Sequence, residues 1–384
     1  MPDPSAGHVE MIPLAQPDIT DAERDAVLAV LQTPTLTMGP QGKAFEAAMA
    51  RFAGVRHAIA ANSGTSALHL VVRALGIGEG DEAITTPFSF IASSNCILFE
   101  RARPVFVDIE PRTLCIDPER VERAISPRTK AILAVDVFGH PADWGALTEI
   151  ARRHELLLVE DSAESLGSTL DGRRCGSFGD AAVFAFYPNK QITTGEGGIV
   201  LTNDEKTAKL CWSLVSQGRD ESGAWLQHPR LGYNYRMDEM SAALGLAQLS
   251  RITEIMAART RVASWYKEAL QMVEGVEPPY VAAGVTMSWF VYVVRLDSRF
   301  SALDRARVMK GLQNEGIGCR DYFQPIHLQP FYRELLKTKE GDFPVTESVA
   351  ERTIALPFYN QMTQNEVQTV VEALRDLVTS VGKV

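Results

Sequence analysis

Short apolar runs alternate with amphipathic runs along the first 220 residues of the chain. The short runs are rich in β-branched residues and predict strands, whereas the runs between them carry apolar residues at helical spacing. We expect strands at 57–62, 81–87, 104–109, 130–138, 156–163, 181–186 and 198–203. We expect helices at 65–76, 92–102 and 143–154. This alternation indicates βαβ units and an α/β fold with a mostly parallel sheet, covered on both faces, whose ligands bind at the carboxyl ends of the strands.

The pattern changes after about residue 236. One long amphipathic helix is expected at 236–270, with Asn234 or Asp238 as a cap. Beyond it, a strand at 289–296 is followed by two more helices, at 305–316 and 362–378. We therefore predict a large domain and a smaller α+β domain, with the helix shared between them. Their predicted bounds are 1–254, with an N-terminal arm at 1–12, and 255–384.

Composition and charge narrow the function. The formal net charge is -10, which disfavours nucleic acid as a partner. No run approaches the ~20 apolar residues of a membrane helix, and the polar N-terminus does not resemble a signal peptide. The five cysteines form no CxxC pair, so we expect neither a disulfide framework nor a metal site, and a cytoplasmic location.

Three polar motifs lie at predicted strand ends. "NSGTSALHL" places Gly64 and Thr65 where a strand passes into a helix, either as a phosphate cradle or as ordinary capping. Asp161 ends a buried strand, where a carboxylate either caps a helix or binds a cation such as a protonated ring nitrogen. Lys190 follows "FAFYPN" and precedes the turn "TGEGG". A lysine is usually a solvated surface residue, but a buried amine at a strand end would be nucleophilic.

A fourth motif, "TTPFSFIASSN", offers Phe88 and Phe90 just past a strand. Each is either a core residue or a platform for a flat ligand. An anion cradle, an aromatic platform, a buried carboxylate and a lysine are together what pyridoxal 5'-phosphate requires. The sequence therefore predicts this cofactor.

The chain also resembles the DegT/DnrJ/EryC1/StrS family of sugar aminotransferases, and within it the perosamine-synthase-like members. The resemblance covers residues 12–380 and rests on "NSGTSALHL", "GIGEGDE", "PRTKAI", "VEDSAES", "FAFYPNKQITTGEGG", "GYNYRM" and "AALGLAQL". It implies the fold-type I (aspartate aminotransferase-like) architecture, with a seven-stranded, mostly parallel sheet and a smaller C-terminal domain. It also implies a homodimer with active sites at the subunit interface.

The resemblance assigns roles to residues around the cofactor ring. Lys190 would form the Schiff base and move the proton, and Asp161 would pair with the pyridine nitrogen. Phe90 would stack on one ring face and Ala163 on the other. Glu164 stands near the ring hydroxyl, where relatives often carry Gln or His.

The phosphate would be bound by Gly64 and Thr65, together with Asn234 of the neighbouring subunit. The family usually has a serine where this chain has Ala185, and that hydroxyl touches the phosphate. Its loss would cost on the order of 1.5–3 kcal/mol if nothing compensated. The other contacts remain, so we expect cofactor binding to survive.

Substrate contacts are implied less specifically. Arg236 is a candidate for an anionic group of a substrate, or for a salt bridge at the dimer interface. Tyr322 and His327 lie in a segment, "CRDYFQPIHLQPFY", that resembles the part of these enzymes near the bound sugar nucleotide. A lone histidine in an aromatic-rich loop is otherwise structural, which is the interpretation we favour for His327.

The resulting hypothesis is transamination of a nucleotide-linked keto-sugar, with L-glutamate as amino donor, to supply amino sugars for surface polysaccharide or natural-product glycosylation. We expect a GDP- or dTDP-linked 4-keto-6-deoxyhexose, ahead of UDP-linked acetamido sugars. One alternative is a sugar dehydratase, whose family members carry histidine in place of Lys190. The others are a non-catalytic scaffold or regulatory protein, and an enzyme that acts on amino acids alone, such as a decarboxylase.

Overall fold

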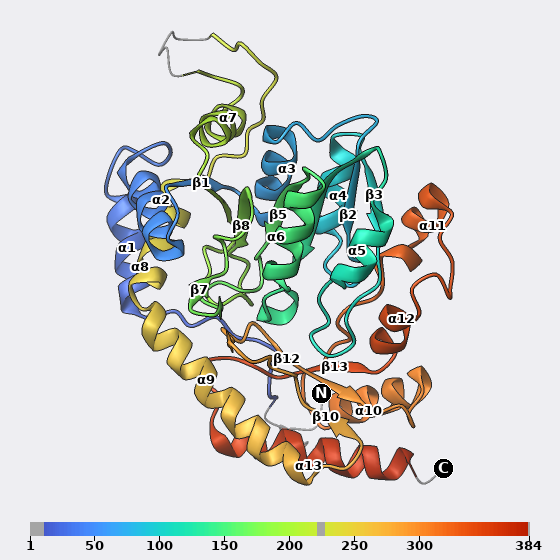
Figure 1. Cartoon of the computed structure of the whole chain (residues 1–384). Helices are drawn as coiled ribbons and strands as arrows, with labels where there is room; N and C mark the ends of the chain where they lie inside the picture. The colour runs from blue at the N-terminus through green and yellow to red at the C-terminus, as the bar shows by residue number, and fades with distance from the viewer. Residues whose placement is uncertain (1–10, 221–226, 383–384) are drawn as a thin grey trace, which may run out of the picture.

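The computed structural model describes residues 11–220 and 227–382 and has the α/β architecture that the sequence predicts (Figure 1). Its main sheet has seven strands in the order β1-β9-β8-β5-β4-β2-β3. These strands are β1 (His57–Ala61), β2 (Glu82–Thr85), β3 (Arg103–Phe106), β4 (Thr129–Val135), β5 (Leu157–Asp161), β8 (Ala181–Ala185) and β9 (Gly198–Thr202). Only the pairings of β9 with β1 and β8 are antiparallel, so the prediction of a mostly parallel sheet is confirmed.

Helices cover both faces of this sheet. They are α2 (Pro40–Ala53), α3 (Gly64–Ala74), α4 (Ala92–Phe99), α5 (Pro118–Ala124), α6 (Trp144–Arg153), α7 (Glu205–Val215) and α8 (Glu239–Ser250), whereas α1 (Asp21–Leu31) packs on α8. Alternate residues of one strand point to opposite faces. In β8, Val183 packs in the core that contains α3 and α7, whereas Phe184 packs in the core that contains α2 and α8.

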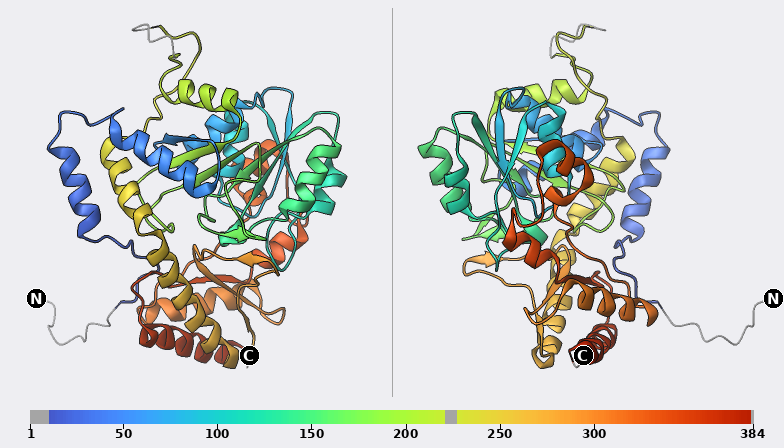
Figure 2. Two further views of the ribbon diagram at one scale, coloured as in Figure 1. Left: turned by 60° about the vertical axis from the view of Figure 1, so that its left-hand side comes forward. Right: turned by 90° about the vertical axis from the view of Figure 1, so that its right-hand side faces the viewer.

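A smaller unit lies below the large sheet in Figure 1, beside the carboxyl-terminal part of helix α9 (Ile252–Ala269). It contains an antiparallel sheet in the order β10-β12-β13. Its elements are β10 (Val276–Glu277), β12 (Tyr292–Leu296), α10 (Ala302–Asn314), β13 (Thr353–Leu356) and α13 (Gln364–Val381). Two short helices, α11 (Pro330–Leu336) and α12 (Pro344–Ala350), stand beside the large sheet (Figure 2). A third small sheet joins β11 (Val285–Thr286), β6 (Thr169–Leu170) and β7 (Arg173–Arg174), and single 3-10 turns occur at Val137–Gly139, Leu270–Met272 and Ile326–Leu328.

The long helix predicted at 236–270 is two helices. The break falls at Arg251, which ends α8 and precedes α9. Its guanidinium forms ion pairs with Asp18 and Glu23, so the break is fixed against the N-terminal segment. Asp238 caps α8 by accepting a hydrogen bond from the Ser241 amide at 2.9 Å, as predicted.

The strand predicted at 289–296 begins only at Tyr292. Trp289 has a left-handed backbone conformation, with φ of 52°, which an extended strand does not tolerate. The segment before Tyr292 therefore turns away from the strand direction and reaches the predicted site.

The predicted domain boundary at 254/255 falls inside α9. Ile255 packs with the core under the large sheet, whereas Val262 and Tyr266 pack in the smaller unit. Residues 1–10 of the predicted arm lie outside the described part of the chain. Ile12, its last residue, is buried in the smaller unit's core and pairs with Ile317.

Candidate active site

Lys190 lies in the loop between β8 and β9, and its side chain is 13% exposed. Its amide donates to the Tyr187 carbonyl at 2.9 Å, which closes a turn just after the strand ends. Its Nζ lies 3.5 Å from Glu164 Oε1 and 3.8 Å from the centre of the Phe290 ring. Burial lowers the pKa of the Lys190 amine, and the carboxylates of Glu164 and Asp161 offset part of this change. The amine is thus shifted toward its neutral, nucleophilic form.

Asp161 is the last residue of β5 and is also buried. Its Oδ2 accepts a hydrogen bond from the Ser93 hydroxyl at 2.8 Å, and its Oδ1 accepts from the Ala163 amide at 3.2 Å. Burial raises the pKa of Asp161 to about 6, because these hydrogen bonds and Lys190 do not fully replace water. A carboxylate in this condition is suited to bind a further cation.

The amino terminus of α3 provides the predicted cradle. The Ser63 hydroxyl accepts from the Ser66 amide at 3.1 Å, and the Ser63 carbonyl accepts from the Ala67 amide. Within the described residues this leaves the amides of Gly64 and Thr65 free for an anion. A Cβ at Gly64 would come within 2.6 Å of the Ala185 Cβ, so Ala185, at the end of β8, lies directly beside the cradle.

Glu164 and Ala163 belong to the turn that follows Asp161. Glu164 Oε2 accepts from the Phe138 amide at 2.8 Å, while its Oε1 faces Lys190. Burial raises the pKa of the Glu164 carboxyl, and Lys190 opposes the change. Ala163 is half-buried next to Asp161, where a flat ring bound to that carboxylate would lie.

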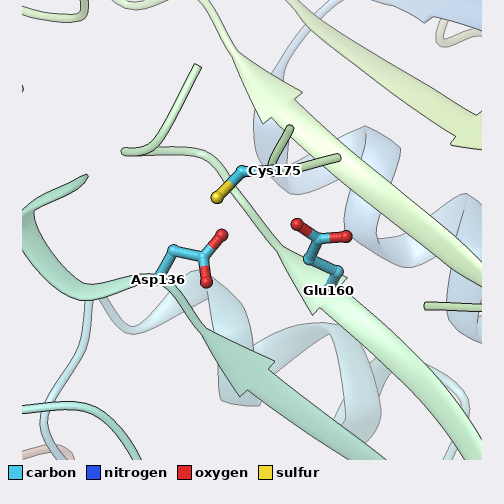
Figure 3. A group of neighbouring side chains, drawn as sticks. All are labelled: Asp136, Glu160 and Cys175. Atoms are coloured by element: carbon cyan, nitrogen blue, oxygen red, sulfur yellow. The ribbon is translucent and has the colours of Figure 1, made fainter. Parts of the chain in front are cut away.

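Buried carboxylates behind this turn hold it in place. Asp136, Glu160 and Cys175 form a tight cluster (Figure 3). Asp136 Oδ2 accepts hydrogen bonds from the hydroxyls of Ser162 and Ser165, at 2.8 and 2.7 Å, which flank Ala163 and Glu164. Asp136 Oδ1 accepts from the Ala142 amide and the Trp144 indole N–H. The Glu160 oxygens accept from the amides of Gly176 and Phe178. We therefore interpret the cluster as a structural support of the turn.

These residues fit the predicted cofactor, pyridoxal 5'-phosphate. Asp161 is a buried carboxylate with a raised pKa and suits a protonated ring nitrogen. The α3 amides suit its phosphate, and Lys190 suits its aldehyde. One mismatch remains in the cradle: Ala185 offers no hydroxyl, as the sequence indicated.

The two phenylalanines of "TTPFSF" have different surroundings. Phe88 is fully buried in the core, where it packs edge-on against Phe138 and Phe323. Phe90 is 61% exposed, and its carbonyl accepts from the same Ser93 hydroxyl that binds Asp161. Phe90 is therefore the one available to stack on a ligand beside Asp161.

Asn234 and Arg236 lie in a strap near the start of α3. The Asn62 amide donates to the Tyr235 carbonyl at 2.7 Å, which fixes the strap against β1. The Asn234 side chain is exposed. Arg236 is half-buried and reaches the Ser216 hydroxyl at 3.4 Å, with no carboxylate partner among the residues described. Both side chains are free to meet a ligand or another subunit.

Tyr322 and His327 have different environments. The Tyr322 hydroxyl lies 3.5 Å from the side-chain nitrogen of Asn189, the residue before Lys190. Burial raises the pKa of Tyr322. His327 is fully buried, and its Nε2 lies 3.0 Å from Glu347 Oε1. These surroundings favour a substrate contact for Tyr322 and a structural role for His327.

Several residues at the site escaped sequence reasoning. Phe290 contacts the Lys190 amine, and Ser93 binds Asp161. Gln191 donates to both the Glu164 carbonyl and the Ser288 hydroxyl at 2.6 Å, which ties the Lys190 loop to the chain before Phe290. The serine-rich run around Ser93 was a signal that could have been used. Nothing in the local pattern separates Phe290 from an ordinary strand residue.

Comparisons with known proteins agree with this site. Residues 17–375 match the model of the DegT/DnrJ/EryC1/StrS aminotransferase family. The chain is 41% identical over 365 residues to GDP-perosamine synthase of Caulobacter vibrioides, covering 94% of this chain and 97% of the relative. It superposes with a TM-score of 0.92 on PseC of Helicobacter pylori, an aminotransferase involved in the biosynthesis of pseudoaminic acid, at 29% identity over 97% of this chain and 100% of that one. It also superposes with a TM-score of 0.92 on Spr1654 of Streptococcus pneumoniae in its PLP form, at 28% identity over 97% and 99% of the two chains.

Proposed function

The chain belongs to the DegT/DnrJ/EryC1/StrS aminotransferase family, and from this premise we propose that it transfers the amino group of L-glutamate to a nucleotide-linked keto-sugar. Its cofactor is pyridoxal 5'-phosphate. The observation that carries the proposal is the Lys190 amine, whose side chain is only 13% exposed, held between Glu164 and Phe290 and within the electrostatic influence of the buried Asp161. This lysine also opposes the alternative of a dehydratase, whose family members have histidine at this position.

When bound, the cofactor supplies an electron sink for the negative charge that develops at the Cα of the amino donor. Asp161 holds the proton on the ring nitrogen that makes this sink effective. Lys190 Nζ would act as the general base that takes the proton from Cα of the amino donor and as the acid that delivers it to C4' of the cofactor, which requires a pKa below that of a free lysine. Glu164, whose Oε1 lies 3.5 Å from Nζ, would orient the amine.

The other residues bind and orient. The Gly64 and Thr65 amides would hold the phosphate, and Phe90 and Ala163 would pack against the ring. Arg236, which has no carboxylate partner among the described residues, would meet an anionic group of a substrate, and Tyr322, beside Asn189, would meet the sugar. His327 is fully buried against Glu347 and would not touch the substrate.

The proposed substrate is a GDP- or dTDP-linked 4-keto-6-deoxyhexose. The name of the Caulobacter relative supports the GDP form. The product would be an amino sugar for surface polysaccharide or natural-product glycosylation. We further infer a homodimer, since the exposed Asn234 side chain makes no hydrogen bond within residues 11–220 and 227–382 and is available to a neighbouring subunit. The five cysteines, all free and buried, support a reducing, cytoplasmic location, and no helix among residues 11–220 and 227–382 could cross a membrane.

Two half-reactions test the function. Purified protein loaded with the cofactor is mixed with L-glutamate and followed by visible absorbance. Loss of the yellow colour, with one 2-oxoglutarate formed per site, supports the amino-donor half. A panel of keto-sugar nucleotides is then added to the bleached protein. Return of the colour with an aminated sugar supports the proposal, whereas sugar dehydration, or return of the colour only with 2-oxo acids, contradicts it.

A further inference from the structure

Arg259 is a buried cation with no anionic partner at contact distance. It lies on α9 and is only 4% exposed. No carboxylate of the described residues comes within ion-pair distance of it, and Asp18 acts on it through Asn360. A buried charge without a direct counter-ion is costly and calls for an explanation.

The Arg259 guanidinium donates hydrogen bonds to the segment Trp289–Phe290 and to the Asn360 side chain. Nε donates to the Trp289 carbonyl at 2.7 Å and Nη2 to the Phe290 carbonyl at 2.7 Å. Nη1 donates to Asn360 Oδ1 at 2.9 Å. The planar guanidinium thus binds the carbonyls of two consecutive residues at once, which the single ammonium group of a lysine could not do in this geometry.

The segment that Arg259 binds has an unusual backbone. Trp289 has φ of 52°, which is uncommon for any residue other than glycine and marks a functional constraint when neighbouring contacts enforce it. On its amino-terminal side, the Ser288 amide donates to the Ser168 hydroxyl at 2.9 Å, and the Ser288 hydroxyl accepts from Gln191. The segment is therefore held from both sides.

This conformation brings the Phe290 ring to the reacting amine. Phe290 is 2% exposed, and its ring centre lies 3.8 Å from Lys190 Nζ. The ring covers a side of the amine that the Glu164 and Asp161 carboxylates do not occupy. Without the turn at Trp289, Phe290 would continue the direction of β12.

We propose that Arg259 is a positioning residue for Lys190: it fixes the left-handed turn at Trp289 and thereby holds the Phe290 ring against the lysine amine. The groups that face that amine are then Phe290, Glu164, Asp161 and, beyond Asn189, Tyr322. The proposal rests on the proposed function only through the role of Lys190. In this proposal, a residue of α9, the helix that joins the two units of the fold, fixes the surroundings of the Lys190 amine.

The test uses Arg259→Lys, which keeps a buried cation but removes the planar guanidinium. Arg261→Lys is the matched control, because Arg261 lies on the same helix with its side chain exposed over Trp265. Cofactor-free full-length protein is acetylated across a pH series, and the modified Lys190 peptide is quantified by mass spectrometry. This readout requires neither cofactor nor substrate. Circular dichroism and thermal melting establish that each variant is folded.

In the Arg259→Lys protein we expect water to reach the amine, so that the midpoint of Lys190 acetylation moves to higher pH. With cofactor restored, we expect kcat to fall by about 10- to 100-fold, with the KM for glutamate little changed. The control should match the wild type in both respects. A folded Arg259→Lys protein with the wild-type acetylation curve would overturn the proposal.

A double-mutant cycle asks whether Arg259 acts through Phe290. Phe290→Leu leaves the peptide groups that Arg259 binds and removes the ring. In this background we expect Arg259→Lys to have no further effect on Lys190; an effect as large as in the wild type overturns the proposal. If the Arg259→Lys protein does not fold, the Phe290→Leu protein is used instead. A Lys190 acetylation curve unchanged by Phe290→Leu then overturns the proposal. If the cycle shows coupling between Arg259 and Phe290 but the protein does not transaminate, the proposed function is refuted and the positioning role of Arg259 stands.

Discussion

Replacing Asp161 by asparagine removes the charge opposite the ring nitrogen and little else. The amide of the new side chain is the same size and can still accept from the Ser93 hydroxyl or the Ala163 amide. The pKa of Asp161 rises from 3.8 to about 6 because the ionised carboxylate is poorly compensated in its buried site. This difference corresponds to about 3 kcal/mol, which a cation on the ring nitrogen offsets.

We take the attraction between this carboxylate and the protonated ring to be of the same order, about 3 kcal/mol, because it has to offset the burial penalty for both groups to stay charged. If the transition state for proton removal depends on that ring charge, a loss of about 3 kcal/mol slows each half-reaction by about 150-fold. The assay is single-turnover absorbance with L-glutamate, at cofactor concentrations that saturate the variant. Ser93→Ala is the comparison, because it removes only one hydrogen bond to the carboxylate and should cost about tenfold. A fully loaded Asp161→Asn protein that reacts within threefold of the wild-type rate would refute the reasoning.

Three further predictions follow from particular residues. Ala185→Ser places a hydroxyl beside the α3 cradle and should tighten cofactor binding by about 10- to 100-fold, measured by equilibrium titration of the cofactor-free protein; equal or weaker binding would count against the cradle. His327→Gln should lower the free energy of unfolding by about 1–3 kcal/mol and leave the KM for the keto-sugar nucleotide unchanged, whereas a raised KM with normal stability would restore a substrate contact. Burial raises the pKa of Glu46 to about 7, so its contribution to stability is complete below its unfolded value of 4.5 and is lost as the pH rises through 7. Glu46→Gln cannot ionise and should therefore gain on the order of 2 kcal/mol relative to the wild type between pH 5 and 9, as seen in paired melting curves; parallel curves would contradict the assignment.

The sequence predicted the features that depend on local pattern. The strands of the large sheet, the turn after Lys190 and the cap at Asp238 all follow from apolar spacing and turn chemistry, and all occur in the structure. The cofactor followed because four motifs occur in the right order, although each is weak alone, and the family followed from a resemblance that rests on seven segments of the sequence. Asp161 and Lys190 were found because charged residues at the ends of apolar runs are rare.

Other features depend on contacts between distant parts of the chain. The break at Arg251 is set by ion pairs with Asp18 and Glu23, more than 200 residues away. Phe290 reads as one more residue of an apolar strand, and its place at Lys190 follows from the turn at Trp289 and the grip of Arg259. His327 lies in a segment that resembles the part of these enzymes near the bound sugar nucleotide. Its burial and its pairing with Glu347 in the structure favour a structural role over a substrate contact.

The central claim is that the Nζ of Lys190 carries the cofactor. Borohydride reduction of the yellow protein makes that bond permanent, and mass spectrometry of the digest locates the pyridoxyl group. We predict that it lies on the peptide containing Lys190 and that Lys190→Ala protein shows no such mark. A pyridoxyl group on any other lysine of the wild-type protein would contradict the account.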